Sequence, residues 1–289
     1  MEALSSDELD AALRQWASVK SYVDERPSIN DVSLPISQLA ISPTLKCNLN
    51  CTYCYNYQEN EAFLIRKMPS LEKQGIKRIL QTLSELNLDR KVNIAFIGGE
   101  PLLDANKINY LVRVAKVFSK RKDILVGFLV TTNGITLRKK SVVDLLNQHN
   151  IVVSVSIDGP PEWHDEARRT LKNTGSYDKL AASLEYFFEN YHSDVRSARA
   201  TYRLKPGRMI GTYRHLKQIG FNDIAMGSSD FDNLVLDEGT KLVLFEEMEE
   251  LIAEIRDDLI SGRVLRHSLL TEVFINLYVG NAKQVVCGA

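Results

Sequence analysis

The chain has little cysteine, no long apolar run and no excess of charge of either sign. Four cysteines among 289 residues are too few to build a disulfide scaffold. The longest apolar runs, such as residues 124–130, are far shorter than the roughly 20 residues that a bilayer span requires. The N-terminus is acidic and lacks the apolar core of a signal peptide. These absences predict a cytoplasmic protein with no membrane partner.

The charges of the chain nearly cancel. The sequence holds 36 Lys and Arg residues against 37 Asp and Glu residues, which gives a net charge of −1. Because no dense basic tract offers a footprint for a phosphate backbone, we expect no nucleic-acid partner. Apolar residues make up 44% and charged residues 25%, which is typical of a globular protein.

Apolar, β-branched segments alternate with amphipathic ones from Leu39 almost to the end of the chain. The pattern predicts six strands, over residues 39–45, 92–97, 124–131, 151–157, 197–202 and 223–226. It predicts helices between and after them, over residues 70–86, 105–120, 139–148, 177–191, 208–219 and 240–260. Near-continuous apolar strands are typical of a parallel sheet covered by helices. The expected fold is α/β, a partial (β/α)6 TIM-like barrel with an N-terminal helical extension.

Three regions follow from this pattern. We expect residues 1–36 to form the N-terminal helical extension, with a helix over residues 5–24. Residues 37–262 form the (β/α)6 core. Residues 263–289 hold a last helix, expected over residues 264–284, and a segment that ends shortly after Cys287.

Unusual residues follow four successive strands. The cysteines come after the first predicted strand, GGEP after the second, TTNG after the third and SIDGP after the fourth. In parallel α/β barrels the active site lies at the carboxyl ends of the strands. The four motifs therefore predict a single site at that end of the sheet.

Cys47, Cys51 and Cys54 form a C-x3-C-x2-C motif within eight residues. Three thiolates on one loop can bind three irons of a 4Fe-4S cluster and leave the fourth iron open to an exogenous ligand. The alternative is a zinc loop, but structural zinc takes four ligands, and no second pair of Cys or His lies nearby.

The two motifs that follow the cysteines have local interpretations of their own. Gly98 and Gly99 let the backbone approach a ligand closely, and Glu100 offers a carboxylate to a cation such as an ammonium group. Asn133 and Gly134 fit a plain turn as well as they fit the lining of a site.

The cysteine motif, with the aromatic Tyr53 just before its last cysteine, resembles the radical S-adenosylmethionine (radical SAM) superfamily. That resemblance implies a 4Fe-4S cluster and S-adenosylmethionine (SAM) as cofactors. SAM would chelate the open iron, and an electron from the cluster would cleave it to a 5'-deoxyadenosyl radical that abstracts hydrogen from a substrate. The resemblance also implies a reducing electron donor such as flavodoxin or ferredoxin.

Further motifs are similar to those of this superfamily and imply SAM contacts. GGEP, 44 residues after Cys54, is similar to the motif that binds the methionine amino group, which implies roles for Gly98, Gly99 and Glu100. The pattern from Ser156 to Arg168 resembles radical SAM enzymes with a SPASM extension. It implies that Ser156 and Arg168 contact SAM. Residues 220–229 resemble the sixth strand of these enzymes, which implies Ile224 against the adenine, with an ordinary core residue as the alternative; Tyr53 and Asn133 are further candidates at the SAM site. It implies no catalytic side chain beyond the cluster and SAM.

The narrower resemblance implies a peptide or protein substrate. Maturation of a ribosomally made peptide, for example by cross-link formation, is the leading expectation. Formylglycine formation by an anaerobic sulfatase maturase is the alternative within the family, and a non-catalytic metal-binding scaffold is the alternative outside it. The C-G-A segment at Cys287 resembles the start of a SPASM domain, so we expect this chain to be the catalytic barrel of a longer enzyme.

Overall fold

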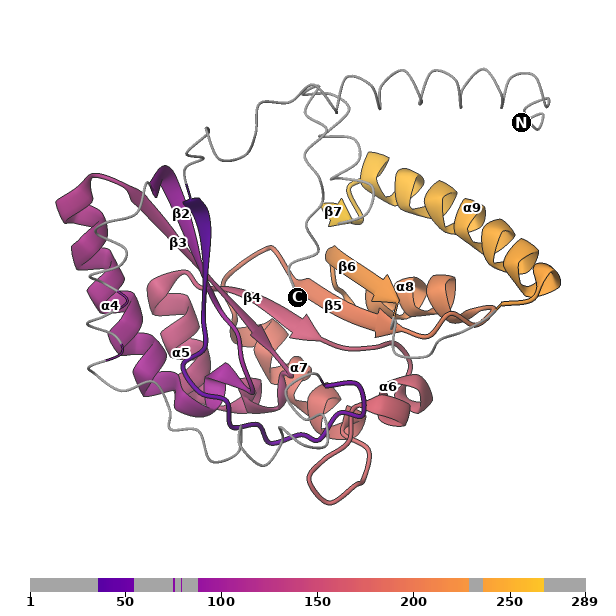
Figure 1. The fold of residues 1–289 in the computed structure, drawn as a ribbon, viewed down its shortest axis with the longest axis horizontal. Coiled ribbons are helices and arrows are strands. Elements are labelled where there is room, and N and C mark those ends of the chain that lie inside the picture. The colour runs from indigo at the N-terminus through magenta and orange to yellow at the C-terminus, as the bar shows by residue number, and fades with distance from the viewer. Residues whose placement is uncertain (1–35, 55–74, 76–78, 80–87, 229–235, 268–289) are drawn as a thin grey trace.

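The computed structural model of the protein describes residues 36–54, 75, 79, 88–228 and 236–267 (Figure 1). Its centre is a seven-stranded sheet in which every neighbouring pair is parallel and the strands follow one another in chain order. The strands are β1 (Ile36–Ile41), β2 (Leu88–Phe96), β3 (Leu125–Thr132), β4 (Val152–Ser156), β5 (Ser197–Tyr202), β6 (Asp223–Ser228) and β7 (Arg266–His267).

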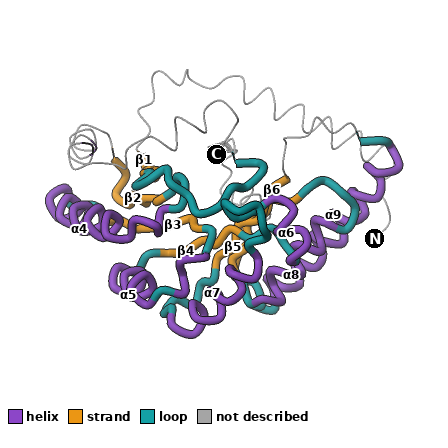
Figure 2. The backbone as a smooth tube through the Cα atoms, turned by 90° about the horizontal axis from the view of Figure 1, so that it is seen from below, coloured by secondary structure: helices purple, strands orange, loops and turns teal. Residues whose placement is uncertain are grey.

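Helices cover the outer side of the curved sheet (Figure 2). They are α4 (Ala105–Lys122), α5 (Lys140–His149), α6 (Pro161–Ala167), α7 (Tyr177–Asn190), α8 (Arg208–Ile219) and α9 (Glu238–Ile260). Along β4, Val153 and Val155 are fully buried, whereas Ser154 and Ser156 are half-buried. Because successive side chains of a strand point to opposite faces, β4 buries one face in the core and turns Ser156 to the other.

The predicted fold class is confirmed, since the sheet and its helices form a partial barrel of βα units. Strand β5 and helix α8 have the predicted bounds, and the other predicted elements within the described ranges are shifted by a few residues. The sheet has a seventh strand that the sequence pattern did not predict, because two residues are too short to show periodicity.

The last predicted helix is wrong at its beginning. Residues 264–267 are not helical, and Arg266 and His267 pair with β6 as strand β7. The sheet thus extends past the expected core boundary at residue 262. The helix expected over residues 5–24 lies outside the described residues, as does the chain beyond residue 267. Of the helix predicted over residues 70–86, only Gly75 and Ile79 are described, and both are helical.

Three short elements lie at the carboxyl ends of the strands, where the unusual motifs are. The 3-10 helix η3 (Pro101–Asp104) follows β2, and the 3-10 helix η4 (Ile135–Arg138) follows β3. Helix α6 follows β4. Each is too short for a periodic pattern to predict, and each begins one of the loops that build the site. None of the helices among the described residues is long and apolar enough to cross a membrane.

Candidate functional site

The cysteine loop is held by a distant part of the chain. The backbone N–H of Asn50 donates to the carbonyl of Arg169 at 2.7 Å, and that of Thr52 donates to the carbonyl of Ala167 at 2.9 Å. Just before them, Leu49 is almost fully buried and forms an antiparallel bridge with Thr170. The loop therefore has a fixed path across the carboxyl end of the sheet, set by the segment that follows α6.

The thiols of Cys47, Cys51 and Cys54 are half-buried, and none of the three forms a disulfide. Burial raises the pKa of Cys47 to about 12 and also raises the pKa of Cys51. A bound metal reverses this preference, because its positive charge stabilises the thiolate. Three thiols on one anchored loop match the donor set of a 4Fe-4S cluster, so these residues fit the group that the sequence predicts.

A single-metal site is not formed by side chains of the described residues. Among them, no three His, Cys, Asp or Glu side chains are grouped as ligands for one metal ion. The zinc loop that the sequence left open therefore has no assembled ligand group in the described part of the chain.

The GGEP segment packs on the residues just before the cysteine loop. The N–H groups of Gly99 and Glu100 donate to the carbonyls of Thr44 and Lys46 at 3.2 and 2.8 Å. A Cβ atom on Gly99 would overlap the carbonyl oxygens of Leu45 and Lys46. The close approach that the sequence predicts is thus made here to the protein's own backbone, immediately before Cys47.

The Glu100 carboxylate is completely buried. It accepts hydrogen bonds from the backbone N–H groups of Leu102 and Asn133, at 3.1 and 2.7 Å, and from the Thr132 hydroxyl at 2.8 Å. Burial raises its pKa to about 7, although these hydrogen bonds act in the opposite direction. Glu100 therefore joins the segment after β2 to the turn after β3.

Asn133 connects that turn to the cysteine loop. Its side-chain Nδ2 lies 2.7 Å from Asn48 Oδ1 and 3.8 Å from Cys47 Sγ, while its Oδ1 accepts the N–H of Ile135 at 3.2 Å. The amide is therefore oriented at both ends. Asn133 therefore builds the turn and also contacts the cysteine loop. Its contact with SAM stays a prediction.

Tyr53, Asp158 and Arg168 form a buried polar group beneath the loop. Asp158 accepts the Tyr53 hydroxyl at 2.7 Å, Arg168 Nε at 2.8 Å and the Thr201 N–H at 2.9 Å. The guanidinium of Arg168 also lies over the Tyr53 ring, 5.4 Å from its centroid. Burial alone would lower the pKa of Arg168, but Asp158 raises it, and burial raises the pKa of Tyr53. Within the described residues the Nη atoms of Arg168 have no hydrogen-bond partner.

His164 orders the segment that carries Arg168. Its Nδ1 accepts the N–H of Asp158 at 3.3 Å, so Nε2 carries the proton and donates to Ser176 Oγ at 3.1 Å. Ser176 in turn donates to the carbonyl of Arg168 at 2.6 Å. Burial lowers the pKa of His164 to about 4, which keeps it neutral. The residue thus orders the segment between β4 and α7.

Two predicted SAM contacts lie elsewhere on the sheet. Ser156 ends β4, half-buried, in register with Arg199 of β5. Ile224 of β6 is fully buried in the hydrophobic core. Its contact with an adenine ring stays a prediction, and it would require the core to open, because the side chain has no exposed surface. Cys287 lies outside the described residues.

A cavity of about 220 Å³ opens beside the cysteine loop, between α6 and α8. Its walls combine aromatic, hydroxyl and charged side chains. They come from the loop, from the ends of β4 and β5, and from the two helices: Thr52, Tyr53, Asp158, Trp163, Glu166, Ala167, Thr201, Tyr202, Arg203, Arg208 and Thr212. The cavity gives the loop a neighbouring space with mixed polar and apolar walls.

The sequence assigned no role to two residues that build this site, Asp158 and Thr132. Asp158 receives three hydrogen bonds and Thr132 holds Glu100. The position of Asp158 could have revealed its role. A carboxylate between a buried strand and a Gly-Pro turn needs hydrogen-bond or charged partners. No sequence signal distinguishes Thr132 from Thr131 before the strand's phase is known.

Comparison with known proteins identifies the family to which the sequence is similar. A family model described as the radical SAM superfamily matches residues 41–198. The chain is 28% identical over 156 residues to the cysteine-type anaerobic sulfatase-maturating enzyme of Clostridium novyi, covering 52% of this chain and 40% of that protein. It is 26% identical over 185 residues to the radical SAM cyclopropyl synthase TigE of Paramaledivibacter caminithermalis, covering 60% and 38%. The chain thus spans 40% or less of these relatives.

Solved structures match the fold over most of the chain. The structure of anSMEcpe with bound AdoMet and the Kp18Cys peptide has a TM-score of 0.71 at 20% identity, covering 88% of this chain and 69% of that one. SuiB of Streptococcus suis with bound S-adenosylmethionine has a TM-score of 0.52 at 17% identity, covering 92% and 53%. At these identities the matches establish a shared fold.

Proposed function

The chain belongs to the radical SAM superfamily, as its motifs predict, and on this premise we propose that it is an active enzyme that modifies a peptide. The cofactors of this superfamily are a 4Fe-4S cluster and SAM. When bound, they would supply a 5'-deoxyadenosyl radical that abstracts hydrogen from the substrate. The proposal rests on the anchored loop of three thiols. Glu100 and Asn133 link this loop to the carboxyl ends of β2 and β3.

The residues of this chain have distinct roles in the proposal. Cys47, Cys51 and Cys54 would hold the cluster as thiolates. The Nη donors of Arg168, oriented by Asp158, would bind the SAM carboxylate. Gly98, Gly99, Glu100 and Asn133 would shape the methionine end of the site, and Tyr53, Ser156 and Ile224 would lie toward the rest of SAM. Part of a substrate or cofactor would fill the cavity beside Tyr53.

A peptide substrate is supported by the relative that is named a sulfatase-maturating enzyme and by the solved structure of anSMEcpe with a bound peptide. Formylglycine formation on a sulfatase is the second candidate, favoured by the match to the Clostridium novyi protein. Incubation with a cysteine-containing sulfatase peptide distinguishes the two, because a maturase lowers the peptide mass by the conversion of Cys to formylglycine. An unchanged peptide, with SAM cleaved, would favour another peptide substrate.

The decisive test is anaerobic reconstitution followed by iron and sulfide analysis and a SAM-cleavage assay with dithionite. We expect about four irons and four sulfides per chain and formation of 5'-deoxyadenosine. Replacing Cys47, Cys51 and Cys54 together by Ala should abolish both. A single zinc in place of the cluster would refute the proposal and leave a metal-binding scaffold.

Cys287→Ala serves as the matched control, because it removes the fourth cysteine of the chain and leaves the three-cysteine motif intact. Its iron content and SAM cleavage should equal those of the parent. Loss of the cluster in this variant would show that Cys287 is a ligand, and it would contradict the assignment of an open iron.

A further inference from the structure

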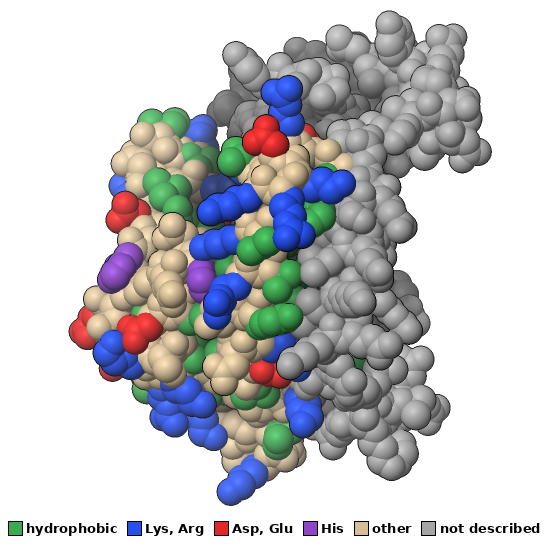
Figure 3. Space-filling view, turned by 90° about the vertical axis from the view of Figure 1, so that its left-hand side faces the viewer, with side chains coloured by type: hydrophobic (Ala, Val, Ile, Leu, Met, Phe, Trp, Pro, Cys, Tyr) green, Lys and Arg blue, Asp and Glu red, His purple; other side chains and the backbone are tan. Residues whose placement is uncertain are grey.

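Helix α4 carries an unusual concentration of positive charge. Its 18 residues include six basic ones, Lys107, Arg113, Lys116, Lys120, Arg121 and Lys122, and no acidic one, although the whole chain has a net charge of −1. Figure 3 faces the side of the molecule where α4 lies, and Lys and Arg side chains gather there with hydrophobic side chains between them. The concentration calls for a physical explanation.

Helix stabilisation explains only part of it. Basic side chains in the last turn of a helix interact favourably with its dipole, which accounts for Lys120, Arg121 and Lys122. Lys107 pairs with Asp104 at 2.7 Å, and Lys116 contacts His149 at 3.1 Å. The dipole does not explain Arg113 in the middle of the helix.

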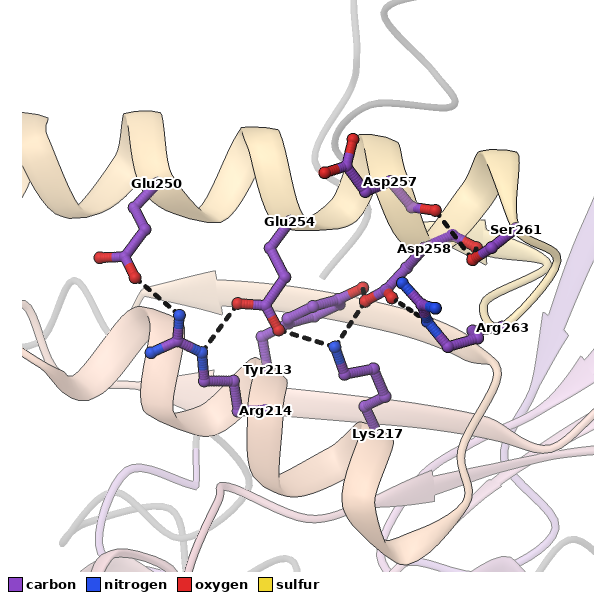
Figure 4. Close-up of polar contacts among 9 residues, drawn as sticks. All are labelled: Tyr213, Arg214, Lys217, Glu250, Glu254, Asp257, Asp258, Ser261 and Arg263. Carbon is purple, nitrogen blue, oxygen red and sulfur yellow. Dashed lines mark hydrogen bonds and ion pairs between the residues drawn. The ribbon is translucent and has the colours of Figure 1, made fainter.

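Cations that join helices look different in this protein. On α8, Arg214 pairs with Glu250 and Glu254 of α9, and Lys217 pairs with Glu254 and Asp258, at 2.6 to 2.7 Å (Figure 4). The remaining Lys or Arg residue of α8, Arg208, pairs with Glu166. By contrast, Arg113, Lys120 and Arg121 of α4 are exposed and form no ion pair within the described part of the chain. Among the described residues, these three cations therefore join α4 to no other element by an ion pair.

Apolar side chains lie among these unpaired cations. Tyr110 is 46% exposed and Val117 is 53% exposed, and with Arg113 and Lys120 they recur every three or four residues, on one face of α4. Tyrosine and arginine are the residue types that contribute most at protein interfaces. We call this face, made of Tyr110, Arg113, Val117, Lys120 and Arg121, the basic face of α4.

The near end of α4 lies beside the cysteine loop. Residues 101–104 connect the helix to Glu100, whose N–H donates to the carbonyl of Lys46 next to Cys47. Lys107 Nζ lies 3.5 Å from the carbonyl of Pro43. At 1.5 Å per residue, the helix extends about 27 Å from there. A carrier of about 100 residues, with a radius of gyration of about 13 Å, could cover the whole helix and still reach the loop.

We propose that the basic face of α4 is the docking surface for an acidic one-electron carrier protein that reduces the cluster. The inference rests on the proposed function, which needs one electron for each reduction of the cluster. The negative surface of the carrier would be complementary to the unpaired cations, which raises the rate of encounter more than the affinity. Tyr110 and Val117 would provide the small apolar contact that such transient complexes use.

The test uses the reconstituted full chain and the triple variant Arg113→Glu/Lys120→Glu/Arg121→Glu. Cluster reduction is followed by absorbance, with a reduced plant-type ferredoxin as the acidic carrier and dithionite as a reductant that needs no docking surface. At low salt, the rate constant with ferredoxin should fall at least tenfold in the variant, whereas the rate with dithionite should stay within about twofold. Added salt should slow the parent with ferredoxin and barely affect the variant.

The matched control is Lys172→Glu/Lys179→Glu/Lys205→Glu, which makes the same charge change at exposed positions away from α4. It should accept electrons from ferredoxin at the parent's rate. An equal loss of rate in both triple variants would show that only the net charge of the chain matters. An unchanged rate in the α4 variant would show that the basic face of α4 does not bind the carrier. Either result overturns the proposal.

A calorimetric titration of ferredoxin into the chain measures docking without the cluster, and it should show weaker binding only in the α4 variant. This separates the two hypotheses. If the parent makes no 5'-deoxyadenosine with dithionite, the proposed function fails, whereas the titration still decides the docking surface. Binding of an acidic peptide but not of ferredoxin would identify another occupant and refute the carrier.

Discussion

The side-chain amide of Asn133 lies 3.8 Å from the sulfur of Cys47, in a turn that follows a different strand from the one before the cysteine loop. The N–H of Leu49 donates to the same sulfur at 3.4 Å. Donors to a ligating sulfur stabilise the reduced cluster and raise its reduction potential. Asn133→Ala should therefore lower the potential by roughly 20 to 65 mV, equivalent to one hydrogen bond of about 0.5–1.5 kcal/mol.

A potentiometric titration monitored by electron paramagnetic resonance measures this shift. Asn147→Ala is a suitable control, because Asn147 bonds the carbonyl of Asn190 and belongs to α5. Its potential should match the parent's. A parent-like potential in Asn133→Ala, with the cluster fully loaded, would mean that the amide only shapes the turn.

Arg168→Ala should destabilise the protein strongly. The change leaves the Asp158 carboxylate buried without its counter-charge, because only 2% of that side chain is exposed. Breaking such a pair costs about 3–5 kcal/mol of the free energy of unfolding. Urea denaturation of the apoprotein measures the loss. The double variant Asp158→Asn/Arg168→Ala should be less destabilised than Arg168→Ala alone, and additive losses would show that the two side chains do not interact.

Glu100→Gln should weaken SAM binding without removing the cluster. A glutamine can accept from Leu102 and Thr132 with its oxygen, but its NH₂ group would then face the N–H of Asn133 as a second donor. The turn loses one charge-assisted hydrogen bond, worth about 1.5–3 kcal/mol, which predicts a roughly 10- to 150-fold increase in the SAM dissociation constant. Equilibrium dialysis of the loaded protein measures it. Iron loss with unchanged affinity would assign Glu100 a structural role.

His164 should make stability depend on pH. Its pKa is about 4 in the folded protein, against 6.5 without burial. Between these values the unfolded chain binds the additional proton, so stability is complete above pH 6.5 and is lost as the pH falls toward 4. The loss attributable to His164 is at most about 3 kcal/mol. Unfolding of His164→Gln should lack this part of the slope, whereas exposed His192→Gln should keep it; equal slopes for His164→Gln and the parent would contradict the assignment.

Much of this arrangement follows from two sequence rules. Helical and strand periodicity predicted the βα units, and the parallel-sheet rule brought the motifs after the first three strands to one edge. Glu100 does meet Thr132 and Asn133 there, and Asn133 meets Cys47. These contacts could be anticipated as neighbours because the strand order equals the chain order.

Other contacts could not be predicted from periodicity. Tyr53 and Asp158 are 105 positions apart, and their hydrogen bond depends on how the loop after β1 crosses to the end of β4. The short helix α6 and strand β7 have too few residues to show a period. Around Val264 and His267 the buried positions fit the spacing of one helix turn, so the pattern alone favoured a helix where the chain joins the sheet.

The backbone bonds from Asn50 to Arg169 and from Thr52 to Ala167 also impose an order of events during synthesis. The bonded residues Asn50 and Arg169 are 119 positions apart, so at ~5–20 residues per second the loop is made roughly 6 to 24 s before its partner segment. Until then the three thiols have no anchored loop to arrange them. The proposed cluster would therefore assemble after β4 and α6 have folded, and the nascent thiols would need a reducing environment throughout that interval.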